Sequence, residues 1–108
     1  MIIALKNKDT LIVEDFRLKC CIGKGGLKRN KYEGDGSTPK GTFEFGKLYW
    51  RPDKVIKPTT KLSCRKINKK MGWCTDPKSN YYNKETTIKS KTIHEKLFRK
   101  DYKYNYFI

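Results

Sequence analysis

The sequence predicts a mainly β fold with one short helix. Short apolar runs alternate with polar residues along most of its 108 residues, and glycine, proline and asparagine separate the runs. The mean hydropathy is −0.85, yet the chain has five Phe, seven Tyr and two Trp. Such aromatic content argues against disorder, and the length allows one domain with one core.

Three strands are expected in the N-terminal part of the chain. Ile2–Leu5 and Thr10–Glu14 flank a turn-forming Asn-Lys-Asp sequence, and Phe16–Ile22 follows with clear alternation of apolar and polar residues. The glycine run Gly23–Gly26 ends this third strand. It lacks the spacing of a phosphate-binding loop and no helical pattern follows it, so we interpret it as a strand exit.

A glycine-rich stretch at residues 31–43 precedes the next strand. Gly34 and Gly36 flank Asp35, so the backbone there can adopt positive φ and turn sharply. The carboxylate of Asp35 can accept a hydrogen bond from the backbone two residues further on. On composition alone, this stretch is a loop between two strands.

The next strands are expected at Thr42–Trp50 and Leu62–Ile67. The first of them is rich in aromatic residues, and Phe43 and Phe45 fall on one of its faces. The segment that follows is rich in turn-forming residues, and within it we interpret Trp73 as a packing anchor rather than a ligand platform.

One helix is expected, at Ile93–Lys100. Thr92 and Glu95 have the spacing of a capping box, and Leu97 follows Ile93 by one turn. His94 would then lie in the first helical turn. The final strand is expected at 102–108, and its apolar face would need a further element to cover it.

The formal net charge of +15 comes from 26 basic and 11 acidic residues. Such a balance ordinarily suggests an anionic partner. Only five of the basic residues are arginine, and the lysines are spread along the chain, which favours a solvated lysine-rich surface. The alternative is a small nucleic-acid-binding protein that uses tyrosines as stacking platforms. Its candidate tyrosines are Tyr81, Tyr82, Tyr102 and Tyr104.

The four cysteines, Cys20, Cys21, Cys64 and Cys74, show no C-x-x-C spacing, and His94 is the only histidine. No metal site and no cofactor site is therefore expected. We expect buried free thiols rather than a disulfide framework.

Three ordered blocks resemble the catalytic domain of L,D-transpeptidases, the YkuD-type cell-wall enzymes, and most closely their stand-alone branch. The first block consists of Glu33, Gly34, Asp35, Gly36, Thr38, Pro39, Gly41 and Phe43. The second consists of Gly72, Trp73, Asp76, Pro77, Tyr82 and Asn83, and the third of Glu95, Leu97, Arg99, Asp101 and Tyr104. These positions are expected to be mostly structural, although Glu95, Arg99 and Asp101 could form a network of opposite charges. The alternative for these three is a solvated helix end with one Glu–Arg pair.

The resemblance implies a β-sandwich of mixed sheets and an acyl transfer between peptidoglycan stem peptides by a cysteine nucleophile. In the family, a histidine on a strand and a Gly-Cys pair form the catalytic centre, and both would follow the residues present here. We therefore expect residues 1–108 to be a single, C-terminally truncated domain without catalytic activity. The other interpretation is a non-catalytic module that binds stem peptides or a cell-envelope partner.

The resemblance suggests a location in the periplasm or cell envelope. No signal peptide and no transmembrane segment is visible in the sequence, because the apolar run Met1–Leu5 is far too short for either. The sequence leaves the location open.

Overall fold

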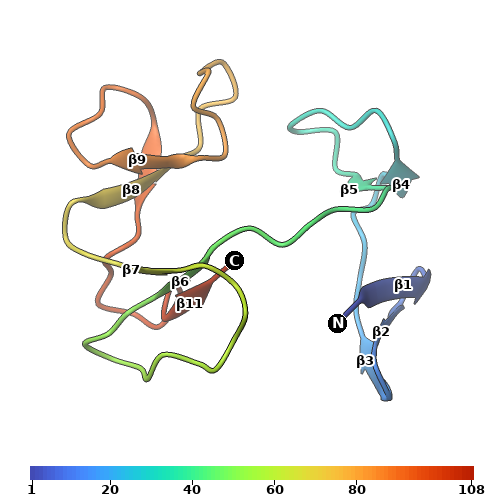
Figure 1. Cartoon of the computed structure of the whole chain (residues 1–108). Coiled ribbons are helices and arrows are strands. Elements are labelled where there is room, and N and C mark those ends of the chain that lie inside the picture. The colour runs from blue at the N-terminus through green and yellow to red at the C-terminus, as the bar shows by residue number, and fades with distance from the viewer. The chain divides into compact units, whose positions relative to one another are not determined.

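The computed structural model describes residues 1–108 and contains eleven strands in four small sheets, and no helix (Figure 1). The predicted mainly β class is confirmed. The chain forms two compact units, Met1–Phe43 and Glu44–Ile108, and each is described by itself below. No helix of the kind that crosses a membrane is present.

The first unit begins with an antiparallel meander. It is built from β1 (Ile3–Asn7), β2 (Thr10–Val13) and β3 (Phe16–Lys19), in that order across the sheet. The three predicted strands are therefore present, although β3 ends at Lys19 rather than at Ile22. The pairing aligns six apolar residues on one face: Ile3, Val13 and Phe16 in one row, and Leu5, Leu11 and Leu18 in the next.

A short parallel pair completes the first unit. It consists of β4 (Leu27–Lys28) and β5 (Thr38–Pro39). The backbone before β4 lies directly against the backbone before β5, since the Gly25 amide donates to the Gly36 carbonyl oxygen at 2.9 Å. A Cβ atom at Gly23 would lie 2.1 Å from that same oxygen. The glycine run is therefore required by close backbone packing.

The second unit contains two three-stranded sheets (Figure 1). One has the order β11-β6-β7, in which β6 (Leu48–Trp50) is parallel to β7 (Cys64–Lys66) and antiparallel to β11 (Tyr106–Phe107). The other is antiparallel, with the order β10-β8-β9, from β8 (Met71–Cys74), β9 (Glu85–Thr87) and β10 (His94–Lys96).

A small apolar core holds the second unit together. Its buried residues are Tyr49, Ile67, Met71 and Leu97, against which Trp73, Phe98, Tyr104 and Phe107 pack. Strand β6 is buried at all three of its residues, so it is the central element of this unit.

The predicted helix at Ile93–Lys100 is wrong, because strand β10 occupies its first half and pairs with β8. Ile93 is 70% exposed whereas Leu97 is fully buried, so the two do not share a buried helical face. The capping box does not form either. The Thr92 amide donates to the Ser90 hydroxyl at 3.2 Å, while the Glu95 carboxylate accepts from Tyr104.

Two predicted strands are much shorter than expected. Of Thr42–Trp50 only Leu48–Trp50 is a strand, and Phe43 and Phe45 are 68% and 43% exposed in a segment that pairs with no other strand. The C-terminal strand is confined to Tyr106–Phe107. The residues before it form a turn instead, in which the Asn105 amide donates to the Tyr102 carbonyl oxygen at 3.1 Å.

Candidate functional site

The first motif block forms a closed turn around Asp35. Its carboxylate accepts hydrogen bonds from the backbone amides of Ser37 at 2.8 Å and Tyr32 at 3.2 Å, and from Lys31 Nζ at 3.3 Å. The Ser37 amide above all lowers the pKa of Asp35 to about 2. Its side chain is only 1% exposed. The carboxylate therefore stabilises the turn and is not available to a ligand.

The other residues of this block also make structural contacts. Gly34 and Gly36 have φ values of 84° and 64°, the left-handed region that glycine adopts without strain. The Thr38 hydroxyl accepts from the Gly23 amide at 2.8 Å, and Pro39 ends β5. Further residues of the block, Glu33, Gly41 and Phe43, lie on the exposed surface.

The second and third blocks come together in the second unit. Trp73 in β8 lies directly opposite Glu95 in β10, and Gly72 lies opposite Lys96. A Cβ atom at Gly72 would lie 3.1 Å from the His94 ring and 3.2 Å from the Glu95 carbonyl oxygen. Glycine therefore allows β8 and β10 to approach closely at this point.

Four rings form an aromatic cluster beside this strand pair: Tyr49, Trp73, Tyr104 and Phe107. Phe107 is at its centre, with its ring centroid 4.7 Å from that of Trp73, 5.5 Å from that of Tyr104 and 5.7 Å from that of Tyr49. The contacts with Trp73 and Tyr104 are edge-to-face, the geometry that aromatic quadrupoles favour. Trp73 and Tyr104 belong to the motif blocks, whereas Tyr49 and Phe107 belong to none of them and were not predicted as site residues.

Each of the two phenols in the cluster donates a hydrogen bond to a carboxylate. Tyr104 donates a short hydrogen bond to Glu95, and Tyr49 donates to Glu85 at 3.0 Å. Burial, followed by the bond to Glu95, raises the pKa of Tyr104 to about 12. Burial, followed by the bond to Glu85, raises the pKa of Tyr49. The phenol in turn lowers the pKa of Glu95. Each carboxylate also forms an ion pair. Arg65 Nη2 lies 2.7 Å from Glu85 Oε1, and Lys103 Nζ lies 3.6 Å from Glu95 Oε2.

The remaining residues of the second block build the turn after β8. The Asp76 carboxylate accepts from the Lys78 amide at 3.0 Å, and Pro77 lies exposed in the same turn. Asn83 has a φ of 57° and accepts the Trp73 indole N–H at 2.9 Å, which fixes the ring in the cluster. Tyr82, the residue before Asn83, is half-buried.

Arg99 and Asp101 lie outside the cluster and form a pair of their own. Their closest atoms, Arg99 Nη2 and Asp101 Oδ2, are 2.6 Å apart, and both side chains are more than one-third exposed. The ion pair of Glu95 is made with Lys103 and not with Arg99. The third block thus provides two separate pairs.

The comparison with protein families matches the L,D-transpeptidase catalytic domain, the YkuD family, over residues 2–108. The chain belongs to this family. The match covers both units, and the family implies peptidoglycan crosslinking as the process in which the domain takes part. No curated protein and no solved structure matches the chain.

The nucleophile of an L,D-transpeptidase is an accessible cysteine thiolate activated by a histidine. Cys74 lies opposite His94 in the β8–β10 pair but is fully buried. The His94 ring uses Nδ1 to contact the Thr92 carbonyl oxygen at 2.7 Å. All four cysteines are free. The expectation that the thiols are buried is confirmed for Cys74 alone, since Cys20 and Cys64 are half-buried and Cys21 is exposed.

Proposed function

We propose that these residues form the non-catalytic part of an L,D-transpeptidase domain, which binds and positions the stem peptides of peptidoglycan. The family match over residues 2–108 carries this proposal. Two of the three motif blocks build one aromatic cluster in the second unit, and the first block closes a turn in the first unit. The described contacts of the motif residues thus act in folding.

In this family, a cysteine thiolate attacks the last peptide carbonyl of a tetrapeptide stem and releases the terminal D-alanine. The acyl group then passes from the sulfur to the side-chain amine of a diamino acid on a neighbouring stem, which restores the thiol. None of the four cysteines here follows a glycine, and Cys74, the one paired with the histidine strand, is fully buried. We propose that the 108 residues have no transpeptidase activity by themselves.

The proposal is tested by sequencing the DNA past codon 108 in all three reading frames. We expect a histidine-bearing strand pattern followed by a Gly-Cys pair. Joining that segment to this chain should then give crosslinked dimers from disaccharide tetrapeptides, detected by mass spectrometry, whereas the 108 residues alone should give none. A stop codon followed by unrelated sequence, or dimer formation by the 108 residues alone, would contradict the proposal.

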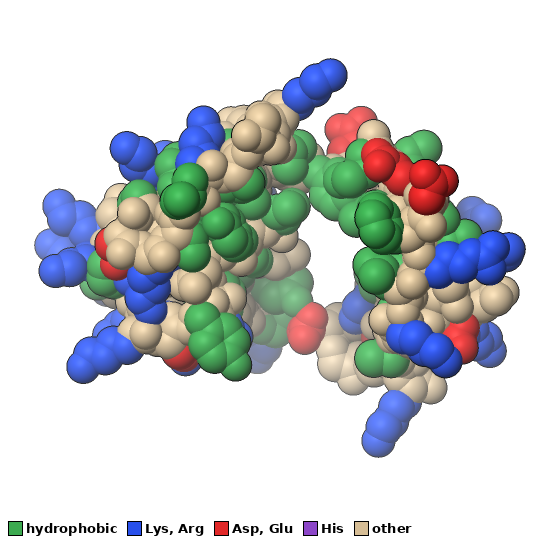
Figure 2. Space-filling view, turned by 90° about the horizontal axis from the view of Figure 1, so that it is seen from below, with side chains coloured by type: hydrophobic (Ala, Val, Ile, Leu, Met, Phe, Trp, Pro, Cys, Tyr) green, Lys and Arg blue, Asp and Glu red, His purple; other side chains and the backbone are tan.

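The net charge of +15 favours a second candidate, binding to single-stranded nucleic acid. The arrangement of the charges does not strengthen it, since Figure 2 shows lysine and arginine side chains spread over the visible surface rather than gathered in one groove. The tyrosines proposed for stacking are also divided, because Tyr104 packs in the aromatic cluster while Tyr81 and Tyr102 are exposed. Binding to a single-stranded oligonucleotide that weakens steeply with salt would support this candidate.

A further inference from the structure

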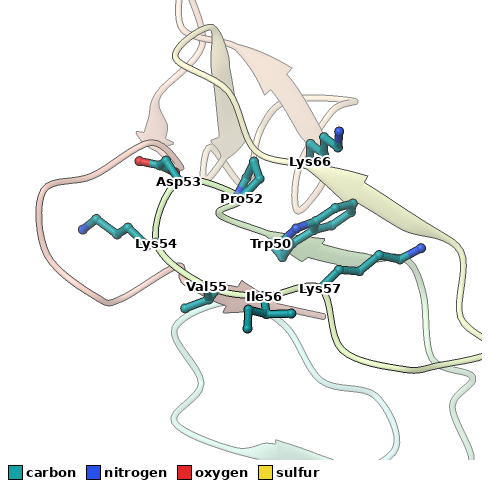
Figure 3. A pocket seen from close by; sticks show the side chains of 8 residues that line it. All are labelled: Trp50, Pro52, Asp53, Lys54, Val55, Ile56, Lys57 and Lys66. Atoms are coloured by element: carbon teal, nitrogen blue, oxygen red, sulfur yellow. The ribbon is translucent and has the colours of Figure 1, made fainter.

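A pocket of about 580 Å³ lies in the second unit between strand β6, strand β7 and the loop that follows β6 (Figure 3). Trp50 and Lys66 contribute from the strands, and residues 52–57 contribute from the loop. None of the three motif blocks supplies a residue to it. The pocket is therefore separate from the aromatic cluster described above.

Three side chains hold the loop in place: those of Arg51, Lys54 and Tyr106. The Arg51 guanidinium, 2% exposed, makes two hydrogen bonds of 2.8 Å to the Asp53 carboxylate and one of 2.5 Å to the Arg99 carbonyl oxygen. The Lys54 ammonium donates to the Asp101 carbonyl oxygen at 2.8 Å, and the Tyr106 hydroxyl donates to the Ile56 carbonyl oxygen at 2.7 Å. Because the loop is already fixed, little conformational entropy is lost when a ligand binds in the pocket.

Two lysines give the pocket a positive charge that no carboxylate neutralises. The negative charge of Asp53 is already paired with Arg51, and the Lys54 ammonium is used on backbone carbonyls. Lys57 and Lys66 form no ion pair, and Lys57 Nζ lies 5.8 Å from the centre of the Trp50 ring. Figure 3 shows the Trp50 indole between the two side chains, with Lys66 above it and Lys57 below it, whereas Lys54 points away. Both lysines line the same pocket, and two unpaired ammonium groups there attract an anionic group.

The remaining walls indicate what carries that anionic group. Pro52, Val55 and Ile56 are apolar, and Ile56 is 88% exposed, so part of the ligand can be a small aliphatic group. The indole of Trp50 is 7% exposed and has no free face on which a nucleobase could stack. The walls thus fit an aliphatic carboxylate better than a nucleotide.

We propose that this pocket binds the C-terminal carboxylate of a peptide that ends in a small aliphatic residue. Lys57 and Lys66 bind the carboxylate, and the apolar loop residues contact the terminal side chain. The inference rests on the proposed function, because stem peptides ending in D-alanine have this chemistry. It goes further in assigning their carboxylate to a site outside the three motif blocks.

Titration of the whole chain with the dipeptide D-Ala-D-Ala, followed by ¹H–¹⁵N NMR, tests the proposal. We expect chemical-shift changes at the Trp50 indole N–H and at the amides of residues 53–57, and no comparable changes with the dipeptide carrying a C-terminal amide. The double variant Lys57→Gln/Lys66→Gln should bind about tenfold more weakly. The matched control is Lys78→Gln/Lys84→Gln, which removes the same charge from exposed positions elsewhere in the second unit and should bind as the unchanged chain does.

Equal binding of the free and amidated dipeptides would overturn the proposal, as would unchanged affinity in the double variant. Inorganic phosphate or an oligonucleotide that displaces the dipeptide from the same amides more effectively would show a general anion site instead. Shift changes in the unchanged chain locate the ligand even if a variant folds poorly. Failure of the proposed function would appear in the sequence past codon 108, so the two failures are distinguishable.

Discussion

Gly23 is a position in the first unit where the neighbouring backbone leaves no room for a side chain. A Cβ atom there would lie 2.1 Å from the Gly36 carbonyl oxygen, and real contacts of this kind are never so short. We expect Gly23→Ala to force the β4–β5 pair apart and to lower the free energy of unfolding by about 2 kcal/mol or more. Urea denaturation measures this. Gly46→Ala is the control, because nothing lies within 4 Å of a Cβ atom at Gly46, and an effect of equal size there would contradict the prediction.

Arg51 is the buried cation on which the loop after β6 depends. Besides its bonds to Asp53 and to the Arg99 carbonyl, the guanidinium lies 3.7 Å from the centre of the Phe98 ring. Lysine keeps the charge but cannot make the forked hydrogen bonds, so we expect Arg51→Lys to cost about 2 kcal/mol in thermal unfolding. Arg65→Lys, at a pair whose arginine is 50% exposed, should cost less than about 1 kcal/mol. Equal costs would show that burial of Arg51 contributes little.

At the scale of the elements, strands β1 to β3 could be predicted because their alternation is local in the sequence. The helix at residues 93–100 was predicted from an equally local signal, the capping box, and is wrong because pairing with β8 and burial of Leu97 override it. The residues that make those contacts lie about twenty positions earlier in the chain, so the local pattern around Thr92 cannot indicate them. For the same reason Tyr49 and Phe107 could not be recognised as partners of Trp73, since only the fold brings their strands together.

Tyr104 links the turn before β11 to strand β10 through its bond to Glu95. Burial of its phenol, followed by that bond, raises its pKa and should make this region sensitive to alkali. The pKa of Tyr104 is raised from 10.0 to about 12 in the folded chain. A raised pKa stabilises the fold below the unfolded value, so this contribution is present below pH 10 and is lost as the pH rises towards 12. We expect Tyr104→Phe to remove that pH dependence from the unfolding free energy. Tyr102→Phe, at a ring that is 84% exposed, should leave it intact, and a similar response in both variants would exclude the buried Tyr104 phenol as the cause.

At the scale of the whole molecule, each unit contains a carboxylate that should make it less stable over the same range of acidic pH. The pKa values of Asp35 in the first unit and Asp101 in the second are lowered from 3.8 to about 2, by the Ser37 amide and by Arg99 respectively. A lowered pKa stabilises the fold above the unfolded value, so each contribution is lost as the pH falls from about 4 to about 2. In the same interval the 11 acidic residues become neutral and leave 26 lysines and arginines unopposed, which adds repulsion in both units.

We therefore expect both units to unfold between pH 4 and pH 2 at low salt, and added salt to move the transition to lower pH by screening the lysines. Tryptophan fluorescence reports the second unit, which contains both Trp50 and Trp73, and the NMR signal of the Ser37 amide reports the first. Asp35→Asn should weaken the pH dependence of the Ser37 signal alone, and Asp101→Asn that of the fluorescence alone. If either variant changed both signals equally, the acid sensitivity would come from net charge rather than from these two carboxylates.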